Sequence, residues 1–199
     1  MRIIAGSFRS RALEAPAGLA TRPTSDRLRE TLFNVLAPRI KGAAFLDLYA
    51  GSGAVGIEAL SRGAAQAVFV ERAPAALKVL RANLARLGLS AGFSIHAGSV
   101  AAYFRPVKRN ESAAFDVVFG FDIVFLDPPY DAEEEYATAL GLLGGAGAGW
   151  LAPGALVIAE HRRKVQLAER FSALERTRLL EQGDAALSFY SSSSKVEPC

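Results

Sequence analysis

The chain has 199 residues, a hydrophobic content of 51% and a net charge of +3. This length suits one large domain with at most a small extension, and the apolar content is ample for a core on both faces of a sheet. The single cysteine, Cys199, excludes an internal disulfide and a cysteine-based metal cluster. Neither His96 nor His161 has a second ligand at metal spacing, so no metal is expected. No stretch reads as a signal peptide or a membrane span, and we expect a cytoplasmic protein with no membrane partner.

Basic charge is concentrated at the N-terminus. Residues 1–41 contain eight Lys and Arg against three Asp and Glu, a net charge of +5, so the remainder of the chain carries −2. Short apolar pairs between Gly and Arg predict a small hairpin over residues 2–14. A capping residue among 24–26 predicts a helix that ends near Leu36. A basic extension of this kind favours contact with a polyanion, with solvated surface arginines as the alternative.

Strands and helices are predicted to alternate from Ala43 onward. The predicted strands cover 44–49, 66–71, 93–97, a run ending at Asp127, 155–160, and a closing antiparallel hairpin of 173–180 and 185–191. The predicted helices cover 54–62, 74–88, 99–104 and 132–143. This alternation predicts the α/β class, with a mostly parallel sheet that helices cover on both faces. We expect this domain to span residues 42–192, after an extension over 1–41 and before a flexible tail at 193–199.

The stretch after Asp47 predicts a ligand-binding turn between a strand and a helix. Gly51, Gly53 and Gly56 stand at this junction, where glycine permits positive φ and a close approach of the backbone to a ligand. The start of the helix offers backbone N–H groups to polar or anionic atoms. The spacing matches the dinucleotide-binding fingerprint, and Glu71 lies about twenty residues further on, where an acidic residue binds ribose hydroxyls.

Two cofactor classes fit this turn, the nicotinamide or flavin dinucleotides and S-adenosylmethionine. Asp47 favours S-adenosylmethionine. A carboxylate at the end of the first strand suits the ammonium group of a methionine moiety, whereas it would repel a pyrophosphate.

Two near copies of one apolar hexapeptide, Phe115–Gly120 and Phe121–Leu126, follow each other directly. Either matches a buried strand by pattern alone. Because only the second copy runs straight into Asp127, we assign the strand to residues 121–126 and interpret the first copy as an extension or a surface insertion.

The tetrapeptide Asp127-Pro128-Pro129-Tyr130 predicts the catalytic site. It follows a buried parallel strand, at the edge where open α/β sheets bind ligands. The two prolines stiffen the turn and expose the Pro128 carbonyl and the Asp127 carboxylate as acceptors. These acceptors suit the two N–H donors of an exocyclic purine amine, while Tyr130 offers a flat face on which the base can stack. The arrangement favours methyl transfer to that amine, because it orients the nitrogen lone pair.

Taken together, the motifs resemble those of class I S-adenosylmethionine-dependent methyltransferases, and more narrowly the RsmD family, over nearly the whole chain. The residues that carry the resemblance are Asp47–Gly53, Asp127–Tyr130, Arg2–Gly6, Arg22–Thr24, Asp26–Glu30, Phe33 with Asn34, and Glu58–Gly63. The family methylates the N2 amine of one guanine in the 16S RNA of the small ribosomal subunit. The resemblance implies a Rossmann-like sheet of seven strands in the order 3-2-1-4-5-7-6.

The resemblance also implies a set of binding residues. S-adenosylmethionine would be held by residues of the first three strand ends: Asp47, Tyr49, Gly51, Ser52, Gly53, Glu71, Ser99 and Val100. Asp127, Pro128, Pro129 and Tyr130 would hold the target guanine. At Ser99 relatives often have an acidic residue that meets the adenine amine, and the Phe115–Gly120 copy is foreign to the family pattern.

The proposed partner is 16S rRNA, within the small subunit or an assembly intermediate, bound by a monomer. Phosphate contacts are assigned to the N-terminal arginines Arg9, Arg11, Arg22, Arg27 and Arg29. Glu133, Glu134 and Glu135 read as a solvated helix start that would repel the RNA backbone. Three other readings remain: a DNA adenine N6 methyltransferase, a nicotinamide-dependent oxidoreductase and a non-catalytic RNA-binding module.

Overall fold

A computed structural model describes residues 1–15, 26–105, 120–129, 132–145 and 148–192. The strands in this part of the chain are β1 Ala44–Leu48, β2 Gln66–Glu71, β3 Phe93–Ala97, β4 Phe121–Leu126, β5 Leu151–Arg162, β6 Arg170–Phe171, β7 Leu174–Gln182 and β8 Ala185–Ser192. The helices are α1 Asp26–Leu36, α2 Ala54–Ser61, α3 Pro74–Arg86, α4 Val100–Tyr103, α5 Glu134–Gly144 and the 3-10 helix η1 Ala148–Trp150.

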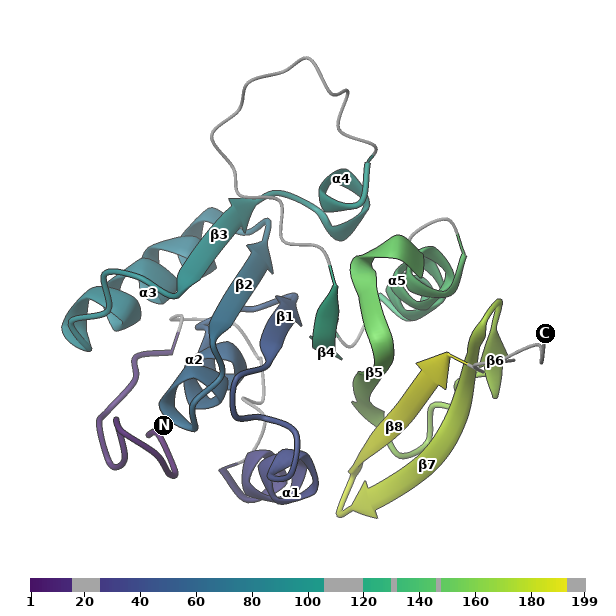
Figure 1. Ribbon diagram of the computed structural model, residues 1–199, viewed down its shortest axis with the longest axis horizontal. Coiled ribbons are helices and arrows are strands. Elements are labelled where there is room, and N and C mark those ends of the chain that lie inside the picture. The colour runs from purple at the N-terminus through teal and green to yellow at the C-terminus, as the bar shows by residue number, and fades with distance from the viewer. Residues whose placement is uncertain (16–25, 106–119, 130–131, 146–147, 193–199) are drawn as a thin grey trace.

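The described strands form one sheet in the order β3-β2-β1-β4-β5-β8-β7-β6 (Figure 1). The first five strands of this order pair in parallel, and the last three join by antiparallel pairings. The expected order 3-2-1-4-5-7-6 is confirmed, because β8 and β7 occupy the places of the expected strands 7 and 6. The two-residue strand β6 was not predicted, and it extends the sheet beyond β7.

Strand β5 is twice as long as its predicted core of 155–160. It begins at Leu151, and Pro153 with Gly154 interrupt the apolar pattern that would have revealed this start. The pairing of β4 with β5 shifts between Phe121 and Ile123, whose partners are Leu151 and Leu156. The irregularity accommodates the additional β5 residues that lie between Leu151 and Leu156.

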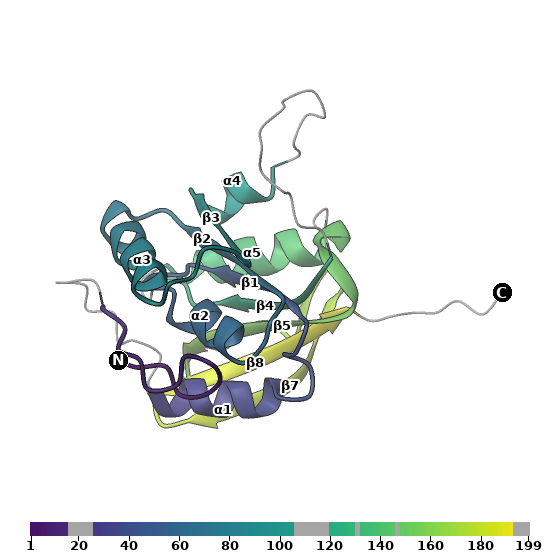
Figure 2. The ribbon, with the colours of Figure 1, turned by 60° about the vertical axis from the view of Figure 1, so that its left-hand side comes forward.

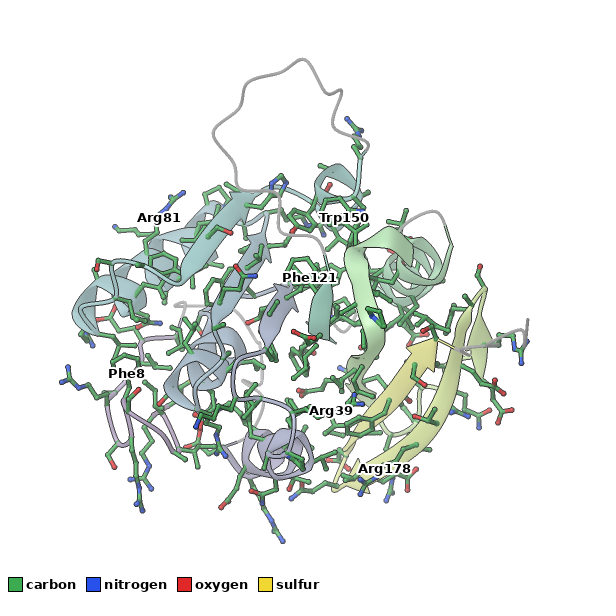
Figure 3. All side chains as sticks on the ribbon, in the orientation of Figure 1. Phe8, Arg39, Arg81, Phe121, Trp150 and Arg178 are labelled. Carbon is green, nitrogen blue, oxygen red and sulfur yellow. The ribbon has the colours of Figure 1, made fainter. Side chains whose placement is uncertain are left out.

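Apolar side chains cover both faces of the sheet, as the alternating pattern predicted. Phe45, Phe69 and Phe125 point to the face that α1, α2 and α3 cover, in a core with helix residues such as Leu32 and Leu80. The other face meets α4 and α5. Figure 2 shows α1 on one side of the sheet and α4 and α5 on the other. Trp150 closes this second core, where its ring centroid lies 5.2 Å from that of Tyr103 (Figure 3). 

The N-terminal segment folds back on itself beside α2, although the predicted hairpin is reduced to one antiparallel bridge between Arg2 and Ala12. Ile3 and Leu13 are buried in the same apolar core as β1 and α1. Glu58 of α2, which is fully buried, accepts hydrogen bonds from the backbone N–H groups of Ile4 (2.8 Å) and Ala5 (3.0 Å). The segment is therefore attached to the sheet domain by both polar and apolar contacts.

Candidate active site

The carboxyl ends of the parallel strands place the predicted site residues along one edge of the sheet. Leu48 of β1 pairs with Val70 of β2 and with Leu126 of β4, so the residues that follow these positions are neighbours. The glycine turn, Glu71 and Asp127 consequently meet at the edge where open α/β sheets bind ligands.

The glycine turn between β1 and α2 has positive φ at Gly51 and Gly53, as the sequence predicts, and also at Tyr49, which was not predicted. Tyr49, Gly51 and Gly53 have φ values of 62°, 56° and 79°. A Cβ atom at Gly53 would lie 2.3 Å from Leu80 Cδ1, whereas at Gly51 the nearest atom within 4 Å would be the Tyr49 carbonyl oxygen at 3.9 Å. Gly53 therefore permits close packing, and Gly51 borders open space that a ligand can enter.

Asp47 lies beneath this turn rather than in the open space. Its side chain is 2% exposed and accepts a hydrogen bond of 2.8 Å from the Gly56 N–H group in the first turn of α2. A Cβ atom at Gly56 would lie 2.3 Å from the Phe69 ring, so only glycine lets the helix approach so closely. Burial raises the pKa of Asp47 to about 7, the hydrogen bond from Gly56 lowers it, and the nearby Glu71 adds to the rise.

Glu71 is fixed at the end of β2 by three backbone N–H groups. Its carboxylate accepts hydrogen bonds from Gly51 (2.8 Å), Arg72 (2.8 Å) and Ala73 (2.7 Å). The bond to Gly51 spans twenty residues of sequence and joins the end of β2 to the glycine turn. The carboxylate is oriented in advance, and its remaining lone pairs can accept bonds from ribose hydroxyls.

Ser99 and Val100 follow β3 at the same edge. The Ser99 hydroxyl caps α4 by accepting a bond of 3.1 Å from the Ala102 N–H group, and Val100 is 3% exposed. The cap occupies an acceptor position of the Ser99 oxygen and leaves its O–H group as a donor.

Asp127 stands at the end of β4 with its carboxyl group in an acidic environment. Pro128 is buried, Pro129 is exposed, and the Pro129 carbonyl accepts a bond of 3.0 Å from the Ala132 N–H group, which closes the turn. Burial raises the pKa of Asp127 well above its ordinary value, and the carboxyl groups of Glu160 and Asp47 raise it further. Tyr130 lies outside the described residues.

Glu160 is a site residue that the sequence reasoning did not identify. It is 2% exposed, and because Leu126 pairs with Ala159, it lies beside Asp127 in the parallel register. A carboxylate at the end of an apolar strand, the feature that singled out Asp127, was the available signal.

Asn83 on α3 was also missed, because its role depends on two distant segments. Its side chain is fully buried, and its amide donates to the carbonyl oxygens of Ser52 (3.0 Å) and Glu14 (3.1 Å). Its oxygen accepts a bond of 2.8 Å from the Glu14 N–H group. A polar residue among the leucines of the apolar stripe of α3 was the signal that could have revealed it.

Glu135 corrects the expectation that residues 133–135 form a solvated acidic helix start. Glu133 and Glu134 are exposed, but the Glu135 carboxylate accepts a bond of 2.8 Å from the Tyr49 hydroxyl. It also lies 3.4 Å from the guanidinium of Arg72. Burial and this carboxylate both raise the pKa of Tyr49.

The arginines that were assigned to RNA differ in their exposure to solvent. Arg9, Arg11 and Arg27 are exposed, and Arg22 lies outside the described residues. Arg29 is fully buried, so its assignment as a phosphate contact is wrong. Its guanidinium lies 3.8 Å from the Glu58 carboxylate, 3.0 Å from that of Asp26, and donates to the Arg2 carbonyl. An arginine three residues from Asp26 on an amphipathic helix gave no sign that it faces the core.

In the part of the chain that the structure describes, no group of three or more His, Cys, Asp or Glu side chains is placed to hold a metal ion. No helix in this same part is long and apolar enough to cross a membrane.

The fold and the site define a class I methyltransferase. Among solved structures, "Putative methyltransferase yhhF" from Escherichia coli superposes with a TM-score of 0.80 at 34% identity, covering 96% of this chain and 97% of that one. Residues 1–191 match the family model described as "Conserved hypothetical protein 95". The chain belongs to this family, the RsmD family of rRNA methyltransferases.

Two curated relatives illustrate the similarity. "Putative rRNA methyltransferase YlbH" of Bacillus subtilis is 37% identical over 190 residues, which cover 96% of this chain and 98% of the relative. "Ribosomal RNA small subunit methyltransferase D" of Escherichia coli is 43% identical over 160 residues, which cover 80% of this chain and 74% of the relative.

Proposed function

We propose that this protein transfers a methyl group from S-adenosylmethionine to the exocyclic N2 amine of a specific guanine in the 16S RNA of the small ribosomal subunit. The observation that carries this proposal is the meeting of the glycine turn and the Asp127 turn at one sheet edge, through the pairing of Leu48 with Leu126. Relatives named as small-subunit rRNA methyltransferases support the substrate class.

The residues at the ends of β1, β2 and β3 fit S-adenosylmethionine. The open space beside Gly51 has room for the methionine end, with Tyr49, Ser52 and Gly53 in the same turn. Asp47 holds the start of α2 beneath this space, and the ammonium group bound above it would favour the ionised form of its carboxyl group. Glu71 would accept the ribose hydroxyls, and Ser99 with Val100 would border the adenine. S-adenosylmethionine supplies an electrophilic methyl group on a sulfonium centre.

Asp127 and the Pro128 carbonyl would accept the two hydrogens of the guanine amine, and Tyr130 would stack on the base. These two hydrogen bonds would point the nitrogen lone pair at the methyl donor. Such positioning lowers the activation free energy by several kcal/mol in favourable cases, up to roughly 7–11. Transfer would form the new N–C bond as the S–C bond of the sulfonium breaks, the neutral thioether S-adenosylhomocysteine would leave, and the proton on the methylated amine would become acidic. The raised pKa of Asp127 makes its carboxylate a better acceptor for that proton, which then passes to water.

The target base has to be unpaired or extruded, because a stacked and paired amine cannot reach the sheet edge. The RNA would approach over the N-terminal segment, where Arg9, Arg11 and Arg27 are exposed. The partner is 16S rRNA in the small subunit or an assembly intermediate, in the cytoplasm, and the protein acts as a monomer.

The test is transfer of labelled methyl groups to small subunits that lack the modification, beside protein-free 16S rRNA and duplex DNA, with nucleoside analysis of the products. We expect N2-methylguanosine in the RNA samples. N6-methyladenine in the DNA would instead establish the adenine methyltransferase. The Asp127→Ala variant should retain cofactor affinity and lose transfer, and undiminished transfer by this variant would reject the mechanism.

A further inference from the structure

Strand β5 projects past the catalytic end of β4 and carries basic residues there. β4 ends at Leu126, opposite Ala159, whereas β5 continues to Arg162 along β8. Arg163 and Lys164 follow directly, and both are exposed. Asp127 is level with Glu160, so Arg163 lies three residues further along, or about 10 Å at the rise of an extended strand.

The turn that bears these side chains is held firmly. The Arg163 N–H group donates to the Asp184 carbonyl (2.8 Å), and the Val165 N–H group donates to the Arg162 carbonyl (2.9 Å). Beneath it, the buried His161 ring lies 2.9 Å from the Ser188 hydroxyl. Because the backbone is already ordered, binding through the Arg163 and Lys164 side chains would cost only their own conformational freedom.

The order of strands decides which way a polynucleotide can leave the site. Along the carboxyl edge the ends of β3, β2 and β1 carry the proposed cofactor residues, the end of β4 carries Asp127, and β5 follows. A nucleotide inserted at Asp127 has its flanking chain on the remaining side, over β5. On the helix that follows Asp127, the exposed Glu133 and Glu134 repel phosphates, whereas Arg163 and Lys164 attract them.

We infer that Arg163 and Lys164 form a second RNA-binding surface, which contacts the phosphates of the single strand next to the target nucleotide. This inference rests on the proposed function and extends it, since the N-terminal arginines alone were assigned to RNA. The exposed side chains at the end of β5 would then bind the RNA next to the extruded base, and those of the N-terminal segment would bind a more distant part of the same RNA.

The experiment compares a double variant with a control of equal charge. Arg163→Gln/Lys164→Gln removes two positive charges at the end of β5, and Lys78→Gln/Arg81→Gln removes two exposed charges on α3, away from β5. Labelled protein-free small-subunit rRNA is titrated with each protein at several salt concentrations. A single strand loses a slope of about 0.7 in log affinity against log salt per contact, so the first variant should lower the slope by about 1.4 and weaken binding about tenfold.

The expected pattern is a lower slope for the β5 variant, an unchanged slope for the control, and wild-type thermal stability for both. An unchanged slope in the β5 variant, or an equal loss in the control, would overturn the inference. Methyl transfer reports separately on the proposed function. If RNA binding depends on Arg163 and Lys164 but no N2-methylguanosine forms, the RNA-binding surface stands and the proposed reaction is rejected. If N2-methylguanosine forms but RNA binding does not depend on Arg163 and Lys164, only the RNA-binding surface is rejected.

Discussion

Asp47 combines two tasks at the residue scale, because its carboxylate holds the start of α2 and lies almost fully buried under the glycine turn. Its pKa of about 7 has a consequence for stability. In the unfolded chain the carboxyl ionises near pH 4, so the folded state binds the proton more tightly. Asp47 therefore contributes fully to the stability of the folded state below pH 4, and this contribution is lost as the pH rises through 7.

The variant Asp47→Asn should remove this pH dependence, because the amide keeps an oxygen for the Gly56 N–H group and carries no charge. Between pH 4 and 8 the wild-type protein should lose up to about 4 kcal/mol of stability relative to the variant. Urea unfolding of both proteins without ligand, at pH 5, 6, 7 and 8, measures the difference. Parallel stability curves would show that Asp47 does not titrate in this range.

Arg29 shows how burial changes the role of a charged residue. Arg29→Met should destabilise the protein by about 3 kcal/mol, because it removes a buried cation from Glu58 and leaves the Arg2 carbonyl without its donor. The slope of RNA affinity against salt should stay at the wild-type value. The matched control is Arg27→Gln on the same helix, an exposed change that should leave stability intact and lower the slope by about 0.7. A lower slope in Arg29→Met would restore its assignment to RNA.

At the scale of elements, the contact between Tyr49 and Glu135 joins the turn after β1 to the first turn of α5, the helix that follows the Asp127 turn. Glu135 thus helps to fix the distance between the proposed cofactor and base sites. Arg72 also reaches Glu135, but its side chain is 59% exposed, and such surface ion pairs contribute little.

A double-mutant cycle should reveal this link. Tyr49→Phe and Glu135→Ala should each lower the free energy of unfolding by about 1–2 kcal/mol, and the double variant should lose little more than either, since the two changes break the same bond. Urea unfolding measures the cycle, and kcat/KM for methyl transfer should fall in the same variants. Glu134→Ala is the control in the same helical turn. Additive losses would argue against a direct link.

For the whole molecule, the exposed arginines of the N-terminal segment and the β5 turn are expected to act on one RNA. They belong to separate elements and share no partner in the described structure, so their contributions should add. Combining Arg9→Gln/Arg11→Gln with Arg163→Gln/Lys164→Gln should lower the salt slope by about 2.8, twice the effect of each pair. Filter binding of small-subunit rRNA at graded salt measures it. A combined variant no weaker than one pair would mean that only one surface contacts RNA.

The sequence by itself determined the class of the fold and the placing of the glycine turn, and the order of the main strands came from the resemblance to a known family. A regular alternation of apolar runs predicts strands that are buried on both faces of a sheet. Positive φ is predictable at glycines because it depends only on local sterics. The strand assigned to Phe121–Leu126 is confirmed for the same reason, because it leads directly into Asp127. Its near copy over 115–119 lies outside the described residues.

Only the tertiary structure decided which charged and polar residues are buried and what they contact. Arg29 and Glu58 are 29 residues apart in sequence, Asn83 and Glu14 are 69 apart, and Tyr49 and Glu135 are 86 apart. No local pattern predicts such a pair, because a buried polar side chain forms its hydrogen bonds with a partner that only the folded chain brings close to it. The position of Arg163 and Lys164 beside the catalytic edge likewise follows from the register of β5 with β4, which is a property of the assembled sheet.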